Sequence, residues 1–149
     1  MKIKVEISEL THEDLVNLMS TTLYGSPVFV GRLLEDWRSL EKRGKEKECF
    51  EDKCANVLRY GGKVAIIDVE AEGERHPIKG VSSLVMEGGE VEYQFDINAV
   101  KNGLKMALES KEDYIRMAAW NFLLDDGSFD AEDAEVVMQM ILFGEVIYG

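Results

Sequence analysis

Residues that could do chemistry are densest between 125 and 135, where the sequence reads DDGSFDAEDAE. A loop of this kind binds Ca²⁺ when oxygen ligands occupy its positions 1, 3 and 5, with Gly at 6 and Glu at 12. Counted from Asp125, positions 3, 5 and 12 are Gly127, Phe129 and Val136, so the calcium pattern fails. We interpret the acids as a turn and a helix start, because carboxylates complement the dipole at a helix N-terminus. A weak calcium site is the alternative.

Metal-binding and nucleophilic residue types are few. The chain has two His, His12 and His76, and two Cys, Cys49 and Cys54. Zinc sites use Cys pairs with closer spacing, and usually two such pairs. We therefore predict a buried Cys54, a partly exposed Cys49 and solvated histidines. Since the sequence also lacks GxSxG and HExxH motifs, it predicts no catalytic constellation, no metal site and no cofactor.

Two glycine pairs could be taken for phosphate-binding loops. A phosphate loop runs from a strand through the loop into a helix. The pair at 61–62 follows an expected helix and precedes an expected strand, which is the wrong order. The pair at 88–89 lies between Glu87 and Glu90, whose charges would repel a phosphate. Both pairs are predicted to be turns.

Charge separates the two parts of the sequence. The chain has 17 Lys and Arg against 29 Asp and Glu, a net charge of −12. Residues 1–86 carry 13 bases and 15 acids, whereas residues 87–149 carry 4 bases and 14 acids, so their net charges are −2 and −10. Such a surface repels phosphate backbones and anionic lipid headgroups, so we expect neither a nucleic acid nor a membrane as a direct partner.

The acidity is strongest from Met117 to the end, where seven acids and no base occur. An acidic face of this kind attracts a protein with a basic groove, and it can imitate the backbone of a nucleic acid. The alternative is a face that only keeps the protein soluble. The residues that we expect to bind a partner are Asp125, Asp126, Asp130, Glu132, Asp133 and Glu135.

The first forty residues predict one strand and two helices. Residues 2–8 alternate between polar and apolar, as a half-buried strand does. Thr11 and Asp14 have the spacing of a capping box, which predicts a helix that ends at Gly25. Apolar residues at helical spacing predict a second helix over 28–40.

The middle of the chain predicts a short helix over 50–58 and then three strands. Residues 63–69 are almost continuously apolar, which is typical of a central strand. Residues 78–86 have a weaker strand pattern, and residues 91–95 alternate clearly. The glycine pair at 88–89 predicts a two-residue type I′ hairpin turn. We expect the three strands to form an antiparallel meander.

The last third predicts three helices. The second helix is marked by Tyr114, Ile115, Ala118 and Phe122. Asp130 and Asp133 have capping-box spacing at the start of the third, whose residues 136–143 are apolar nearly all round. Such a helix lies in the core or is shared with a second subunit, so a homodimer is an alternative. The β-favouring residues 145–148 predict a short closing strand.

The elements are grouped along the chain rather than alternating, which favours an α+β fold over a doubly wound α/β fold. We expect a single domain over residues 1–149. Its small antiparallel or mixed sheet, made of the N-terminal strand and the central meander, should pack with about five to six helices. The start, MKIKVEISEL, lacks the apolar core of a signal peptide, and no apolar run has the length of a membrane span. A cytoplasmic protein is therefore expected.

The two ends, MKIKVEISELTHEDLVNLMSTTLYGS and DAEDAEVVMQMILFGEVIYG, resemble a group of small, acidic, uncharacterised bacteriophage and prophage proteins. The matching residues are Gly25, the glycine pair at 61–62 and the tail LFGEVIYG over 142–149, where the family has an LFGEVVYG-like end. The chain departs from the family at 41–48 and near Ser82. The resemblance implies a setting inside an infected or lysogenic bacterial cell, and it implies no catalytic residue.

Together these observations predict a non-enzymatic phage or prophage accessory protein that binds a host or phage protein. Its sharper form is an acidic nucleic-acid mimic that inhibits a host factor. One alternative is a structural homo-oligomer assembled through the apolar last helix. The other is a metal-dependent enzyme with an unrecognised site that uses acids such as Asp68, Asp125 or Asp126.

Overall fold

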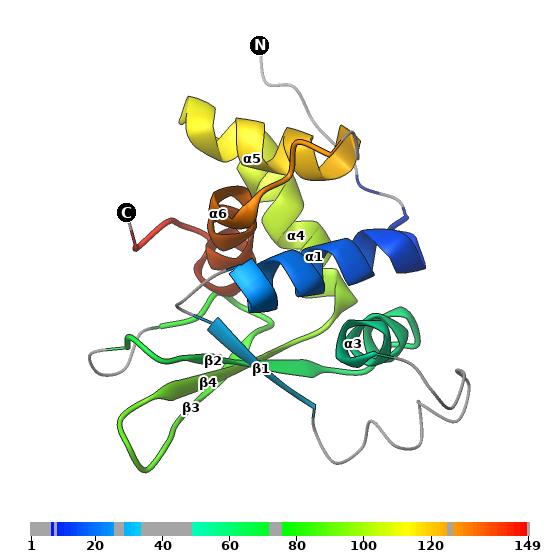
Figure 1. Cartoon of the computed structure of the whole chain (residues 1–149). Coiled ribbons are helices and arrows are strands. Elements are labelled where there is room, and N and C mark those ends of the chain that lie inside the picture. Colours follow the sequence, from blue (N-terminus) through cyan, green and yellow to red (C-terminus); the bar gives the residue numbers. More distant parts are fainter. Residues whose placement is uncertain are drawn as a thin grey trace.

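The structure is a computed structural model that describes residues 7, 9–25, 29–33, 49–71, 76–124 and 127–148. It has the predicted α+β fold, with helices packed on one face of a small antiparallel sheet (Figure 1). The helices are α1 (His12–Gly25), α3 (Phe50–Arg59), α4 (Ile97–Leu108), α5 (Asp113–Leu124) and α6 (Ala131–Phe143). The strands are β1 (Phe29–Leu33), β2 (Val64–Asp68), β3 (Ser82–Val85) and β4 (Val91–Phe95).

The sheet has the strand order β1-β2-β4-β3, and every neighbouring pair is antiparallel. The central position predicted for β2 is confirmed, but the predicted meander is wrong because β4 lies between β2 and β3. Tyr93 of β4 faces Ile66 of β2 on one side and Ser83 of β3 on the other. The strands with mostly buried side chains, β2 and β4, take the interior of this part of the sheet. The more exposed β3 takes the edge, where a strand needs less apolar surface.

The helix predicted over 28–40 is wrong at residues 29–33, which form β1. This strand pairs with β2 from Phe29 opposite Asp68 to Leu33 opposite Val64. Buried β2 needs partners for its backbone groups on both sides, and β1 supplies them on one side. This pairing outweighs the helical spacing of the apolar residues, because Gly31 and the β-favouring residues around it have a low helix propensity. The rest of that predicted helix lies outside the described residues. The same holds for the strand predicted over 2–8, of which only residue 7 is described.

The hairpin between β3 and β4 is present, but its turn is not type I′. A type I′ turn needs a positive φ at both central residues. Of the two glycines, Gly89 alone has a positive φ, at 89°. The backbone N–H of Met86 donates to the carbonyl oxygen of Glu90 at 2.7 Å, and the N–H of Gly89 donates to that of Met86 at 2.9 Å. The loop is therefore one residue longer than predicted, with Gly89 in the left-handed position that ends such loops.

The capping predictions for α1 and α6 are confirmed. In α1, the N–H of Thr11 donates to Asp14 Oδ2 at 2.9 Å, and the N–H of Asp14 donates to Thr11 Oγ1 at 3.1 Å. In α6, Asp130 and Asp133 form the same reciprocal pair. These caps supply partners for backbone N–H groups that have none within the helix.

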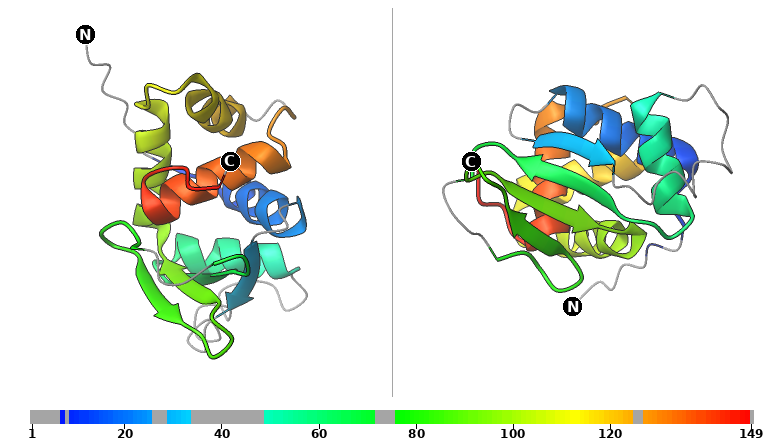
Figure 2. Two further views of the ribbon diagram at one scale, coloured as in Figure 1. Left: turned by 90° about the vertical axis from the view of Figure 1, so that its left-hand side faces the viewer. Right: turned by 90° about the horizontal axis from the view of Figure 1, so that it is seen from below.

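Helix α6 occupies the middle of the helical layer, in contact with α1, α4 and α5 (Figure 2). Every residue from Val137 to Phe143 is buried, which confirms the core interpretation of this helix. Phe143, at the end of α6, packs edge-on against Tyr93 of the sheet with ring centroids 5.1 Å apart. Because this apolar surface is covered within the chain, α6 does not offer the face through which a homodimer was expected.

Candidate functional site

The outer face of α5 carries an unusual row of large apolar side chains. Helix α5 lies at the end of the molecule farthest from the sheet (Figure 1, Figure 2). The face that packs on α4 and α6 contains Ile115, Ala118, Ala119 and Phe122. We call the opposite row the α5 stripe. It consists of Tyr114, Met117, Trp120 and Leu124, which are 53%, 54%, 43% and 61% exposed.

Of the four residues that mark this helix in the sequence, Tyr114 belongs to the exposed α5 stripe and the other three are buried. The sequence DYIRMAAWNFLL is apolar nearly all round, as that of α6 is, but among the described elements α5 has neighbours on one side. The sequence signal for this exposed row is the excess of large apolar side chains over a one-sided pattern. Contiguous exposed side chains of this size on a single chain mark interaction surfaces more often than scattered ones do.

A groove of about 430 Å³ borders the α5 stripe. Its lining comes from α5, α6 and the C-terminal tail: Tyr114, Glu132, Glu135, Val136, Gln139, Val146 and Tyr148. We call this the acidic groove. Tyr114 belongs to both features, so the acidic groove and the α5 stripe form one continuous surface. Its composition is aromatic and aliphatic with two carboxylates at one side.

The structure divides the six acids predicted to bind a partner. Glu132 and Glu135 line the acidic groove. Asp130 and Asp133 serve the helix cap, in which the N–H of Asp133 donates to Asp130 Oδ1 at 2.9 Å and the N–H of Asp130 donates to Asp133 Oδ2 at 3.2 Å. Asp125 and Asp126 lie outside the described residues. Two of the six acids are thus brought together with an apolar surface.

Asp133 also connects α6 to α5. Its Oδ2 accepts a hydrogen bond from Asn121 Nδ2 at 3.0 Å. Partial burial raises the pKa of Asp133 above its ordinary value, against the lowering effect of the hydrogen bonds from Asn121 and the Asp130 backbone. This link fixes the start of α6, and therefore Glu132, relative to the α5 stripe.

The C-terminal tail forms the third wall of the acidic groove, held by a buried glutamine. Gln139 Oε1 accepts hydrogen bonds from the backbone N–H groups of Ile147 and Tyr148, both at 2.7 Å, and Gln139 Nε2 donates to the carbonyl oxygen of Tyr148 at 3.3 Å. The closing strand predicted over 145–148 is wrong, because a side-chain amide takes the backbone groups that a strand would pair. A polar residue inside an otherwise apolar helix was the signal for such an anchor.

Tyr148 ties the same tail to the sheet. Its hydroxyl donates to Asp68 Oδ2 at 2.5 Å, and Asp68 Oδ1 accepts from the backbone N–H of Glu70 at 3.0 Å. Asp68 is fully buried. This acid, considered above for metal chemistry, therefore has a structural role. In the part of the chain that the structure describes, no three His, Cys, Asp or Glu side chains gather closely enough to hold a metal ion.

The two cysteines are placed as predicted, with Cys54 buried and Cys49 exposed. Burial, with a smaller contribution from the nearby Glu51 carboxylate, raises the pKa of Cys54 to about 12. Because the thiolate is the reactive form, Cys54 is suited to packing rather than to nucleophilic chemistry. His76 is exposed as predicted, whereas His12 is only partly exposed and bonds to Asp52.

Comparison with protein-family models, curated proteins and solved structures finds no match to this chain. Among the described residues, no helix is both long enough and apolar enough to cross a membrane. The class of protein defined so far is an α+β domain with an exposed acidic and apolar surface on α5, α6 and the tail.

Proposed function

We propose that this chain is a non-enzymatic accessory protein that binds a basic, amphipathic segment of a partner protein. The observation that carries the proposal is the position of Tyr114, which lines the acidic groove beside Glu132 and Glu135 and also begins the α5 stripe. Apolar side chains of the partner would cover the α5 stripe, and its lysines or arginines would reach the two carboxylates.

Residue types on this surface suit protein binding. Tyr and Trp carry a large part of the binding energy at many interfaces, because they bury a large area with little loss of side-chain freedom. Carboxylates at the rim attract a positively charged partner and fix its orientation. The rings of Tyr114 and Trp120 can also contact an arginine or lysine through cation–π interactions.

The biological setting is proposed from the resemblance of the two ends to phage and prophage proteins. The partner would be a host or phage protein in the bacterial cytoplasm. The nucleic-acid mimic is a narrower form of the proposal, in which the partner presents a basic groove. It is less favoured because the α5 stripe adds apolar surface that a pure charge mimic does not need.

Variants that change one part of the surface at a time test the proposal. Glu132→Lys with Glu135→Lys reverses the groove charges and leaves the cap pair intact. Its cost to α6, through the helix dipole, is about 1 kcal/mol or less per site. The matched control is Glu87→Lys with Glu90→Lys, which makes the same charge change at two exposed positions of the β3–β4 hairpin.

A second pair of variants tests the apolar part. Trp120→Ser shortens the α5 stripe, and Leu84→Ser removes a side chain that is 60% exposed on β3 as its control. In affinity capture from an infected bacterial lysate, proteins retained by the wild type and both controls should be lost from both surface variants. Equal retention by all five proteins would refute the proposed surface.

The same variants distinguish the nucleic-acid mimic and the homo-oligomer from the proposed binding of an amphipathic partner segment. A mimic predicts binding that weakens steeply with salt and is unaffected by Trp120→Ser. A homo-oligomer through the α5 stripe predicts a mass by light scattering that falls to the monomer value in Trp120→Ser. Either result would replace the proposal of an amphipathic partner segment.

A further inference from the structure

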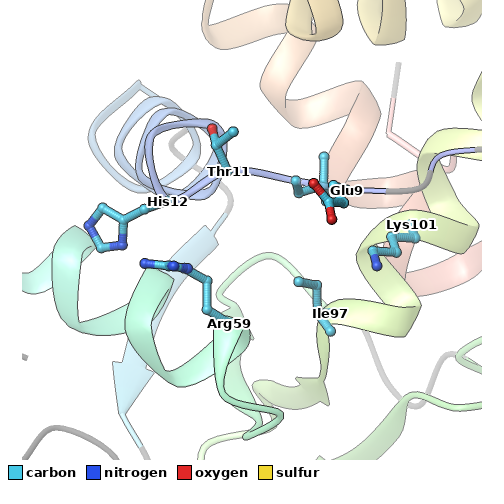
Figure 3. Close-up of a pocket in the computed structure, with 7 residues that line it drawn as sticks. Glu9, Thr11, His12, Arg59, Ile97 and Lys101 are labelled. Carbon is cyan, nitrogen blue, oxygen red and sulfur yellow. The ribbon is translucent and has the colours of Figure 1, made fainter. Parts of the chain in front are cut away.

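A second cavity, of about 420 Å³, lies between the start of α1, the end of α3 and the start of α4. Figure 3 shows His12 and Arg59 close together on one side of it and Lys101 on the other. The described residues that line it are Glu9, Leu10, Thr11, His12, Arg59, Ile97 and Lys101. We call it the basic cavity. None of these described residues also lines the acidic groove.

The charge of the basic cavity is opposite to that of the whole chain. Among the described lining residues, Arg59 and Lys101 are two cations against one carboxylate, Glu9, in a protein of net charge −12. Cations that gather in a hollow concentrate a positive potential there, which raises the local concentration of anions.

We infer that the basic cavity binds a small organic anion through a phosphate or carboxylate group. The Arg59 guanidinium offers two parallel N–H donors that match two oxygens of such a group, and Lys101 supplies a second charge. Leu10 and Ile97 add an apolar wall for the uncharged part of the ligand. A volume of about 420 Å³ is in the range of small-molecule sites.

His12 supplies an additional polar atom near the basic cavity. Its Nε2 is 3.0 Å from Asp52 Oδ1, and this contact orients the ring. Its Nδ1 is buried and has no hydrogen-bond partner among the described residues. Buried polar atoms normally have partners, so this Nδ1 is an atom to which a bound ligand can form a hydrogen bond.

The inference is independent of the proposed protein-binding surface, because the two sites use different elements. Calorimetric titration of the full chain at low ionic strength tests it with four probes: inorganic phosphate, citrate, AMP and the uncharged nucleoside adenosine. Phosphate and citrate distinguish the two anionic groups, and AMP adds an uncharged ring to the phosphate. The inference predicts binding of at least one of the three anions and none of adenosine.

Substitutions then locate the binding. Arg59→Gln and Lys101→Gln should each raise the dissociation constant about tenfold or more, because each removes a charged donor. Lys111→Gln, at an exposed residue between α4 and α5, should leave it unchanged. Arg59 is itself exposed, so its replacement should not disturb folding, which circular dichroism verifies. Failure of all three anions to bind at millimolar concentration, or equal binding by Arg59→Gln and the wild type, would overturn the inference.

Discussion

The hydroxyl of Tyr148 donates a 2.5 Å hydrogen bond to the buried carboxylate of Asp68, although 80 residues separate the two in the sequence. The bond joins the C-terminal tail to the end of β2. Tyr148 also lines the acidic groove. The tail that helps to form the proposed binding surface is thus held in place by the core of the sheet.

Replacing Tyr148 by Phe should destabilise the protein and weaken partner binding. The substitution removes a partner of a fully buried carboxylate, which typically costs about 1–3 kcal/mol. Urea unfolding gives the change in free energy. Tyr24→Phe is the control: it removes a hydrogen bond to Glu51 from a side chain that is 70% exposed, so it should change stability by less than about 0.5 kcal/mol. Equal changes in the free energy of unfolding would show that the hydrogen bond to Asp68 stabilises the protein no more than the exposed one to Glu51 does.

Gly103→Ala should destabilise the contact between α4 and α6. A Cβ at Gly103 would lie 2.6 Å from the Cα of Ile141 and 2.7 Å from its nitrogen, and these backbone atoms cannot rotate away. The gain in helix propensity is about 1 kcal/mol, whereas overpacking costs about 1–3 kcal/mol. We therefore expect a lower melting temperature for Gly103→Ala. Gly88→Ala, where the added Cβ meets nothing within 4 Å, should melt like the wild type; a more stable Gly103→Ala would contradict the close approach.

The two cysteines should react at very different rates with iodoacetamide. Cys49 is exposed, whereas Cys54 is buried and its pKa is raised to about 12. Mass spectrometry of the native protein near neutral pH should find Cys49 labelled first, with Cys54 labelled only on unfolding in urea. Rapid native labelling of Cys54 would show that α3 is not packed as described.

Protonation of Asp133 in mild acid should stabilise the folded protein. The folded pKa of Asp133 lies above the ordinary value of 3.8, mainly because of partial burial. At a pH between the ordinary pKa and the folded pKa, Asp133 binds a proton more readily in the folded state than in the unfolded state. The resulting stabilisation is complete below the ordinary pKa and is lost as the pH rises through the folded pKa.

The comparison with Asp133→Asn isolates this effect. As the pH falls towards 3.8, the wild type should gain stability relative to the variant, measured as the difference in their free energies of unfolding. The gain is expected to be small, since Asp133 is only partly buried. A wild type that instead loses stability relative to Asp133→Asn would show that hydrogen bonding to the charged carboxylate outweighs burial.

Features set by neighbouring residues could be predicted from the sequence. The capping pairs Thr11–Asp14 and Asp130–Asp133, the core position of α6 and the burial of Cys54 all follow from spacing within one segment. Each depends on backbone geometry that a short stretch of chain determines by itself.

Features set by remote partners could not be predicted in this way. Residues 29–33 fit a helical spacing, and only the unpaired edge of β2 makes them a strand. The exposure of Tyr114 likewise depends on which face of α5 packs against α4 and α6. Of the six acids predicted to bind a partner, Glu132 and Glu135 line the acidic groove, but its apolar half and the tail anchored by Gln139 required the three-dimensional arrangement.

Titration of the isotopically labelled protein with a short amphipathic helical peptide of Leu and Lys, followed by NMR, tests the proposed binding surface most directly. A Gly, Ser and Lys peptide of equal charge controls for attraction by net charge alone. We expect shifts centred on Tyr114, Met117, Trp120, Glu132 and Glu135, and binding about tenfold or more tighter than that of the control peptide. Trp120→Ser should reduce this preference, whereas Glu132→Lys with Glu135→Lys should weaken the binding of both peptides. Equal affinity for both peptides, or shifts spread over the whole acidic surface, would contradict the proposed binding surface.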